Sequence, residues 1–216
     1  MNKFNRTVMG WVLGAGLLLA GSVLAGPEEV KGSASATIKQ TSERMLKALE
    51  RQRSALERDP SRIYGLVGQI LVPHFDFEHI TQAAVGRQHW GKASSAQQRT
   101  LTQGFQELLI RTYAKALLNY SGQKIRYLSE KPGRGSSVRV FTEVREPGAD
   151  SVPVDYKVYK QGGKWKIYDV KIDNVSLVSN YRGSFKAEIR RNGIKGLIER
   201  IEEINHYGLK VHSLED

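Results

Sequence analysis

The fold is decided by residues 137–172, which read SVRVFTEVREPGADSVPVDYKVYKQGGKWKIYDVKI. Apolar and polar side chains alternate along this stretch, and a period of two is typical of strands with one buried face. Val140 and Val144 share one face, while Arg139 and Glu143 share the other. The alternation predicts strands over residues 137–145, 152–160 and 164–172.

The connections around these strands are short. Glycine and proline cluster at residues 132–135, 146–150 and 161–163, and a further strand is predicted ahead of them at 124–130. Connections of this length leave no room for a crossover helix, so neighbouring strands have to run antiparallel. We therefore expect a four-stranded antiparallel meander.

Helical periodicity flanks the predicted sheet on both sides. Helices are predicted over residues 37–58, 60–71, 77–85, 94–121, 176–191 and 194–207. Asp76 is placed to cap one of them, Ser94 with Gln97 offers a capping box, and Asn192-Gly193 is expected to bend the chain. Helices, then a meander, then helices indicate an α+β domain with helices covering one face of the sheet.

The amino-acid composition excludes several classes of function. The chain has 216 residues and no cysteine, which excludes disulfides, thiolate catalysis and cysteine-ligated metals. Lysine and arginine number 33 against 22 acidic residues, giving a net charge of +11. A basic surface suggests an anionic partner, such as nucleic acid, lipid headgroups or an acidic protein face. Lys186, Arg190, Arg191 and Lys195 form a basic patch near the C-terminus.

Residues 1–25 have the three-part layout of a secretory signal. Lys3 and Arg6 precede a glycine-containing apolar run, and Ala25 ends a stretch of small and branched residues. The run falls short of the roughly 20 solidly apolar residues that a membrane anchor needs. We expect cleavage after Ala25, a flexible lead-in over 26–36 and a single domain over 37–216. An exported protein is not expected to serve nucleic acid.

One polar cluster invites a metal interpretation. His74, Asp76, Glu78 and His79 fall within six residues. Their spacing matches none of the known zinc patterns, and Asp76 suits a helix cap. We expect no metal site there.

Asp169 and Asp173 could carry acid–base chemistry if one of them were buried. The alternative is structural, with Asp169 pairing with a neighbouring strand and Asp173 capping the following helix. No nucleophile or histidine lies nearby in the sequence, and no nucleophile elbow, phosphate-binding loop or dinucleotide fingerprint occurs. We therefore favour the structural interpretation.

Two stretches carry a family resemblance. The first is VPHFDF at residues 72–77, followed by Gly86 and Trp90; the second is GKWKIYDV at 163–170, running into VSLVSNYR at 175–182 and Phe185. Together they closely resemble the MlaC family of periplasmic phospholipid-binding proteins in the Mla transport system, also called toluene-tolerance auxiliary proteins. The resemblance covers nearly all of the chain after residue 25. Ala84-Val85 stands where the family pattern has Ala-Leu.

The resemblance implies a fold like that of nuclear transport factor 2, with an apolar cavity between helices and sheet. It implies a soluble, monomeric periplasmic carrier that shuttles glycerophospholipid between the inner and outer membranes and maintains outer-membrane lipid asymmetry. The implied partners are an inner-membrane ABC transporter with an MCE-domain subunit and an outer-membrane lipoprotein associated with porins. No catalysis and no cofactor are implied; phospholipid is cargo.

A lipid carrier needs a pocket lined by branched and aromatic side chains. The candidates for lipid contact, for each of which core packing is the alternative, are Leu66, Ile70, Phe105, Leu109, Tyr113, Val138, Val140, Val154, Tyr156, Val158, Leu177, Tyr181 and Phe185. Arg111 and Arg182 are candidates to approach the headgroup. Two other functions stay open: an exported enzyme of the same fold using Asp169 or Asp173 as a general base, and an envelope scaffold without catalysis.

Overall fold

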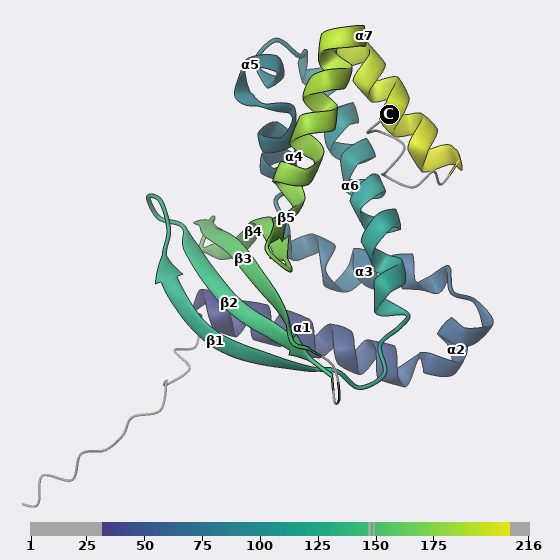
Figure 1. Ribbon diagram of the computed structural model, residues 1–216, viewed down its shortest axis with the longest axis vertical. Helices are drawn as coiled ribbons and strands as arrows, with labels where there is room; N and C mark the ends of the chain where they lie inside the picture. Colours follow the sequence, from purple (N-terminus) through teal and green to yellow (C-terminus); the bar gives the residue numbers. More distant parts are fainter. Residues whose placement is uncertain (1–31, 147, 149, 208–216) are drawn as a thin grey trace, which may run out of the picture.

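The structure, a computed structural model, describes residues 32–146, 148 and 150–207. Six helices and one 3₁₀ turn come first: α1 (Ala34–Arg51), α2 (Arg53–Arg58), α3 (Arg62–Ile70), η1 (Val72–His74), α4 (Phe77–Val85), α5 (Arg87–Trp90) and α6 (Ser95–Leu117). The sheet follows, with β1 (Lys124–Pro132), β2 (Val138–Arg145), β3 (Val152–Gln161), β4 (Lys164–Ile172) and β5 (Val175–Ser176), and α7 (Leu177–Tyr207) comes last. Figure 1 shows the sheet and α1 in the lower part and α4 to α7 above them.

The sheet is an antiparallel meander in the order β1-β2-β3-β4-β5, which confirms the predicted topology. It has five strands, so the prediction of four was wrong. Asp173 and Asn174 both have positive φ, 46° and 67°, and form a tight hairpin turn that folds Val175–Ser176 back onto β4. Asp173 therefore lies in a turn and does not cap the next helix. Ser176 takes that role, because its hydroxyl accepts the backbone N–H of Ser179 at 3.2 Å.

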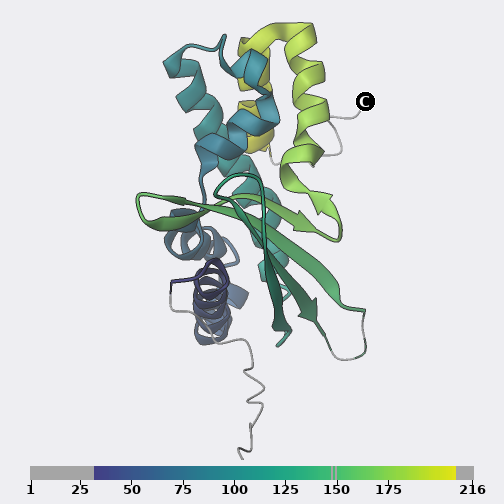
Figure 2. The ribbon, with the colours of Figure 1, turned by 90° about the vertical axis from the view of Figure 1, so that its left-hand side faces the viewer.

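Register places the apolar residues of the strands on one face, as the alternation predicts. Val140 lies opposite Tyr156, and Tyr156 lies opposite Val170. α1 covers this face, and its Ala34 and Ile38 pack against the valines of β2 and β3. Figure 2 shows α1 nearly end-on beside the sheet. One face of the sheet is therefore closed by a helix that comes from the other end of the chain.

Several helix boundaries follow from local chemistry. Asp76 accepts the N–H of His79 and begins α4, and Ser94 with Gln97 forms the capping box of α6, as predicted. The region predicted as one helix over 37–58 is two, because the chain breaks at Gln52. α1 also begins at Ala34, inside the segment expected to be a flexible lead-in, with the Ser33 hydroxyl as its cap.

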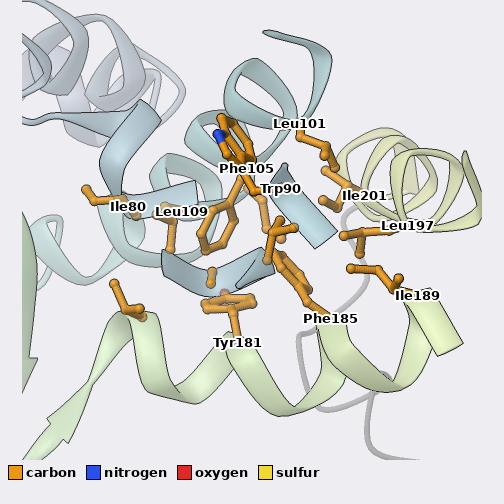
Figure 3. Close-up of a cluster of buried hydrophobic side chains, with 14 of the residues drawn as sticks. Ile80, Trp90, Leu101, Phe105, Leu109, Tyr181, Phe185, Ile189, Leu197 and Ile201 are labelled. Atoms are coloured by element: carbon orange, nitrogen blue, oxygen red, sulfur yellow. The ribbon is translucent and has the colours of Figure 1, made fainter. Parts of the chain in front are cut away.

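The upper helices share a core of their own (Figure 3). Phe105 lies at its centre, with ring centroids 4.9 Å from those of Tyr181 and Phe185. α7 bends at Gly193, which has a φ of 70°, at the predicted position. After the bend, Ile201 approaches α6 so closely that a Cβ at Gly104 would lie 2.9 Å from its side chain. The buried residues of this core come from helices, and they hold α4, α6 and α7 together.

Within the part of the chain that the structure describes, no helix is long and apolar enough to cross a membrane. The predicted signal, residues 1–25, lies outside the described residues.

Candidate functional site

A cavity of about 610 Å³ lies between the covered face of the sheet and the helices. Its walls come from α1, α3, α6, the sheet, η1 with α4, and the first turn of α7. The volume falls within the range of roughly 300–1,000 Å³ typical of small-molecule sites. The region between sheet and helices is thus hollow rather than filled by its own side chains.

The walls are apolar over most of their area. α1 contributes Ile38, Met45, Leu46 and Leu49, and α6 contributes Leu109, Ile110 and Leu117. The sheet supplies Val154, Val170 and Ile172 opposite them. Such walls suit hydrocarbon, because little polar surface loses hydration when hydrocarbon fills the space.

The exposed polar residues of the lining gather at one end. Asn119 near the end of α6 and Glu146 and Asp150 of the β2–β3 connection line the cavity and are exposed. The cavity therefore meets solvent between the end of α6 and this connection. Among the described residues, the charged side chains that line the cavity are Glu146, Asp150 and Asp169, and no lysine, arginine or histidine lines it.

Tyr156 contributes a hydroxyl to the cavity. The side chain projects from β3 into the cavity, where its hydroxyl lies near the hydroxyls of Thr142 and Ser42. Burial raises the pKa of Tyr156 to about 12, because an ionised phenolate would lose its hydration there. The neutral hydroxyl is therefore the form present at physiological pH.

The raised pKa of Tyr156 predicts an alkaline effect on stability. The contribution of the neutral Tyr156 side chain to the free energy of unfolding is fully present below the ordinary tyrosine pKa of about 10. It is lost as pH rises from there through about 12. The free energy of unfolding of the native protein, minus that of Tyr156→Phe, should fall by ~1 kcal/mol between about pH 9 and pH 11. Urea unfolding at each pH measures it. A flat difference for Tyr156→Phe contradicts the prediction.

Asp169 is buried where β4 meets α7. It is 4% exposed, and its Oδ2 accepts Lys157 Nζ from β3 at 2.8 Å. The Ser176 hydroxyl donates to the same carboxylate at 2.8 Å, and the Val178 N–H donates at 3.4 Å. The predicted pairing with a neighbouring strand is confirmed. A carboxylate with these partners ties sheet to helix and is poorly placed to remove a proton from a substrate.

Asp169→Asn should lower the free energy of unfolding by about 2 kcal/mol, because Lys157 loses its buried partner while reaching water only in part. Urea unfolding measures the change. Asp173→Asn is the matched control, since asparagine tolerates positive φ and Asp173 is exposed; its stability should stay within about 0.5 kcal/mol of the native value. Equal stability of the two variants would contradict a structural role for Asp169.

The His74–His79 segment is assigned to local structure. Asp76 caps α4 and also accepts the Tyr159 hydroxyl, and the His79 ring stacks on Tyr168 with centroids 4.8 Å apart. Burial, followed by Arg44 and Lys166, lowers the pKa of His74. No group of three or more potential ligands for a metal ion occurs within residues 32–146, 148 and 150–207.

Five of the thirteen predicted lipid-contact residues line the cavity: Leu109, Tyr113, Val154, Tyr156 and Leu177. The other eight do not line the cavity. Phe105, Tyr181 and Phe185 pack among the upper helices, Leu66 and Ile70 between α3 and its neighbours, and Val138, Val140 and Val158 between sheet and α1. Lipid contact stays a prediction for all thirteen.

Neither predicted headgroup arginine lines the cavity. Arg111 pairs with Glu107 at 2.8 Å on the exposed side of α6, and Arg182 lies in a separate groove beside α7. The sequence interpretation also omitted α1, whose Ile38, Met45 and Leu49 form a whole wall. The helical spacing of these residues could have indicated the wall, because an apolar stripe on a helix faces a region buried away from water.

An α+β domain that encloses a deep apolar cavity with a polar opening defines a binding protein for an apolar ligand. Residues 39–203 match the family model described as MlaC protein, and the chain belongs to the MlaC family.

Two curated proteins are similar to this chain. The intermembrane phospholipid transport system binding protein MlaC of Haemophilus influenzae is 26% identical over 171 residues, covering 77% of this chain and 79% of that protein. The toluene tolerance protein ttg2D of Pseudomonas putida is 26% identical over 153 residues, covering 71% of each. Among solved structures, the phospholipid-binding protein from Ralstonia solanacearum in complex with a phospholipid is similar, with a TM-score of 0.74 and 33% identity. That match covers 81% of this chain and 98% of the other.

Proposed function

We propose that this protein binds phospholipid by enclosing its acyl chains in the cavity between sheet and helices. The observation that carries the proposal is the apolar wall of a cavity of about 610 Å³ that opens to solvent at one end. Membership of the MlaC family supports it, as does the similar Ralstonia solanacearum protein, which was solved with a phospholipid bound.

The energetics favour an enclosed carrier. Burial of a methylene is worth ~0.8 kcal/mol, so keeping about 30 methylenes out of water avoids on the order of 25 kcal/mol. A bilayer avoids the same cost, so transfer between bilayer and cavity is close to neutral. The barrier then lies in extraction of the lipid, which docking at a membrane complex would lower.

The geometry suggests how the lipid lies. Acyl chains contact the inner walls formed by Leu49, Leu109, Val154 and Tyr156. The headgroup remains at the polar end near Asn119 and Glu146, where water can hydrate it. This orientation leaves the hydrated headgroup in water and the acyl chains inside the cavity.

The wider role is a further proposal. The signal-like residues 1–25 and the family favour a periplasmic protein that carries glycerophospholipid between the inner and outer membranes and maintains outer-membrane asymmetry. Its partners would be an inner-membrane ABC transporter with an MCE-domain subunit and an outer-membrane lipoprotein–porin complex. Cell fractionation tests the location: recovery of the mature chain with the cytoplasm would overturn this role.

Organic extraction of protein purified without detergent, followed by mass spectrometry, tests lipid binding. We expect close to one phospholipid per chain. A delipidated sample should also take up phospholipid from donor vesicles and release it to acceptor vesicles. Extracts free of phospholipid, together with no uptake from vesicles, would overturn the proposal.

A further inference from the structure

A second groove, of about 480 Å³, runs between α7 and the junction of α4 with α5. Figure 1 shows these helices side by side at the upper end of the molecule. Arg182 and Lys186 come from the first half of α7, and Arg87 faces them from α5. Ala83 and Val85 supply an apolar part of the lining. Among the described residues, none lines both this groove and the lipid cavity.

The groove carries positive charge on both of its walls. Arg87, Arg182 and Lys186 are exposed, and none has an ion-pair partner among the described residues. His79 and His89 also line it, and no acidic side chain within the described residues does. Like charges that converge from two walls repel one another, so an anion between them is stabilised by all three.

The basic character continues beyond the groove. Arg182, Lys186 and Arg190 follow one another at intervals of four along α7, which places them on one side of the helix, and all three are exposed. Glu78, in the first turn of α4, lines a different depression with Trp90 and Arg99, and Asp76 Oδ2 lies 4.0 Å from Nδ1 of His79. Asp76 is engaged by the His79 N–H and the Tyr159 hydroxyl.

We propose that this groove binds an acidic segment of a partner protein. The shape of the site distinguishes this partner from a membrane, because a flat bilayer surface cannot reach the floor of a concave groove, whereas an extended chain can lie in it. Carboxylates of the segment would meet the three cations, and a small apolar side chain would rest on the partly exposed Ala83.

A partner docked in the groove would leave the opening of the lipid cavity free. It would contact α4 and α7, which also line that cavity. α4 lines the cavity with Phe77 and Ile80 and the groove with Gln82. α7 likewise lines the cavity with Leu177 and the groove with Arg182. A partner can therefore hold the loaded protein without blocking the path of the lipid.

The test uses a fluorescent ten-residue peptide of alternating glutamate and alanine, with a glutamine–alanine peptide as the neutral control. The glutamate peptide should bind the native protein at low ionic strength, and more weakly at physiological salt. Arg182→Glu with Lys186→Glu should weaken binding at least tenfold. Arg134→Glu with Lys164→Glu changes the net charge equally at two exposed hairpin positions and should weaken binding less than twofold.

Two further measurements sharpen the result. Because the chain has no cysteine, Gln88→Cys allows a fluorophore to be attached beside the groove, and its emission should change on adding peptide; the same label at Arg134→Cys should not respond. Equal loss of peptide binding in both double variants would overturn the proposal. Binding to phosphatidylglycerol vesicles that depends on Arg182 and Lys186, without peptide binding, would overturn it in favour of a membrane surface.

Discussion

Leu46→Glu is expected to lower the protein's affinity for phospholipid at least a hundredfold while leaving the protein folded. Leu46 is half-buried on α1 and lines the cavity. In the empty protein, water in the cavity hydrates the new carboxylate. Acyl chains would displace that water, and stripping an unpaired charge costs about 3 kcal/mol or more, which corresponds to a factor above one hundred.

Phospholipid retained after purification, and uptake from vesicles, measure the effect. Leu46→Met keeps an apolar side chain of similar volume and should load normally. Lys47→Glu introduces the same carboxylate at the exposed neighbouring position and should also load normally. Val144→Trp tests the same site independently. It fills space at another half-buried lining position, so it should also lower phospholipid loading. Native loading by a folded Leu46→Glu protein would contradict the cavity as the lipid site.

The sheet could be read from the sequence because its signals are local. Alternation over residues 137–172 and the glycine-containing turns specify strands and their antiparallel order without reference to the rest of the chain. The fifth strand was missed because Asp173 and Asn174 are typical of helix caps as well as of tight turns. Only the backbone, with positive φ at both residues, decides between them.

The cavity could not be read in the same way. Val140 and Val154 occupy equivalent positions on the covered face of the sheet, yet Val140 is 0% exposed in solid core and Val154 lines the hollow. Periodicity reports only that a side chain is turned away from water. Whether it meets another side chain or empty space depends on how far α1 and α6 stand from the sheet, which is a matter of long-range packing.

Phe105→Ala is expected to lower the free energy of unfolding by about 4 kcal/mol without changing the amount of lipid bound by the folded protein. Phe105 is 0% exposed, and its ring packs against both Tyr181 and Phe185, which also contact each other (Figure 3). Its removal would leave a void in the core that joins α6 to α7. The lipid cavity, whose lining does not include Phe105, should keep its walls.

Leu109, one turn further along α6, provides the matched comparison because it belongs to the same core and also lines the cavity. Leu109→Ala should destabilise less than Phe105→Ala, and it alone should alter the lipid species retained, since it widens the cavity. Urea unfolding and mass spectrometry of extracts separate the two effects. If folded Phe105→Ala protein lost its lipid, the aromatic cluster would be part of the binding site, and the division between a solid upper core and a hollow lower one would be wrong.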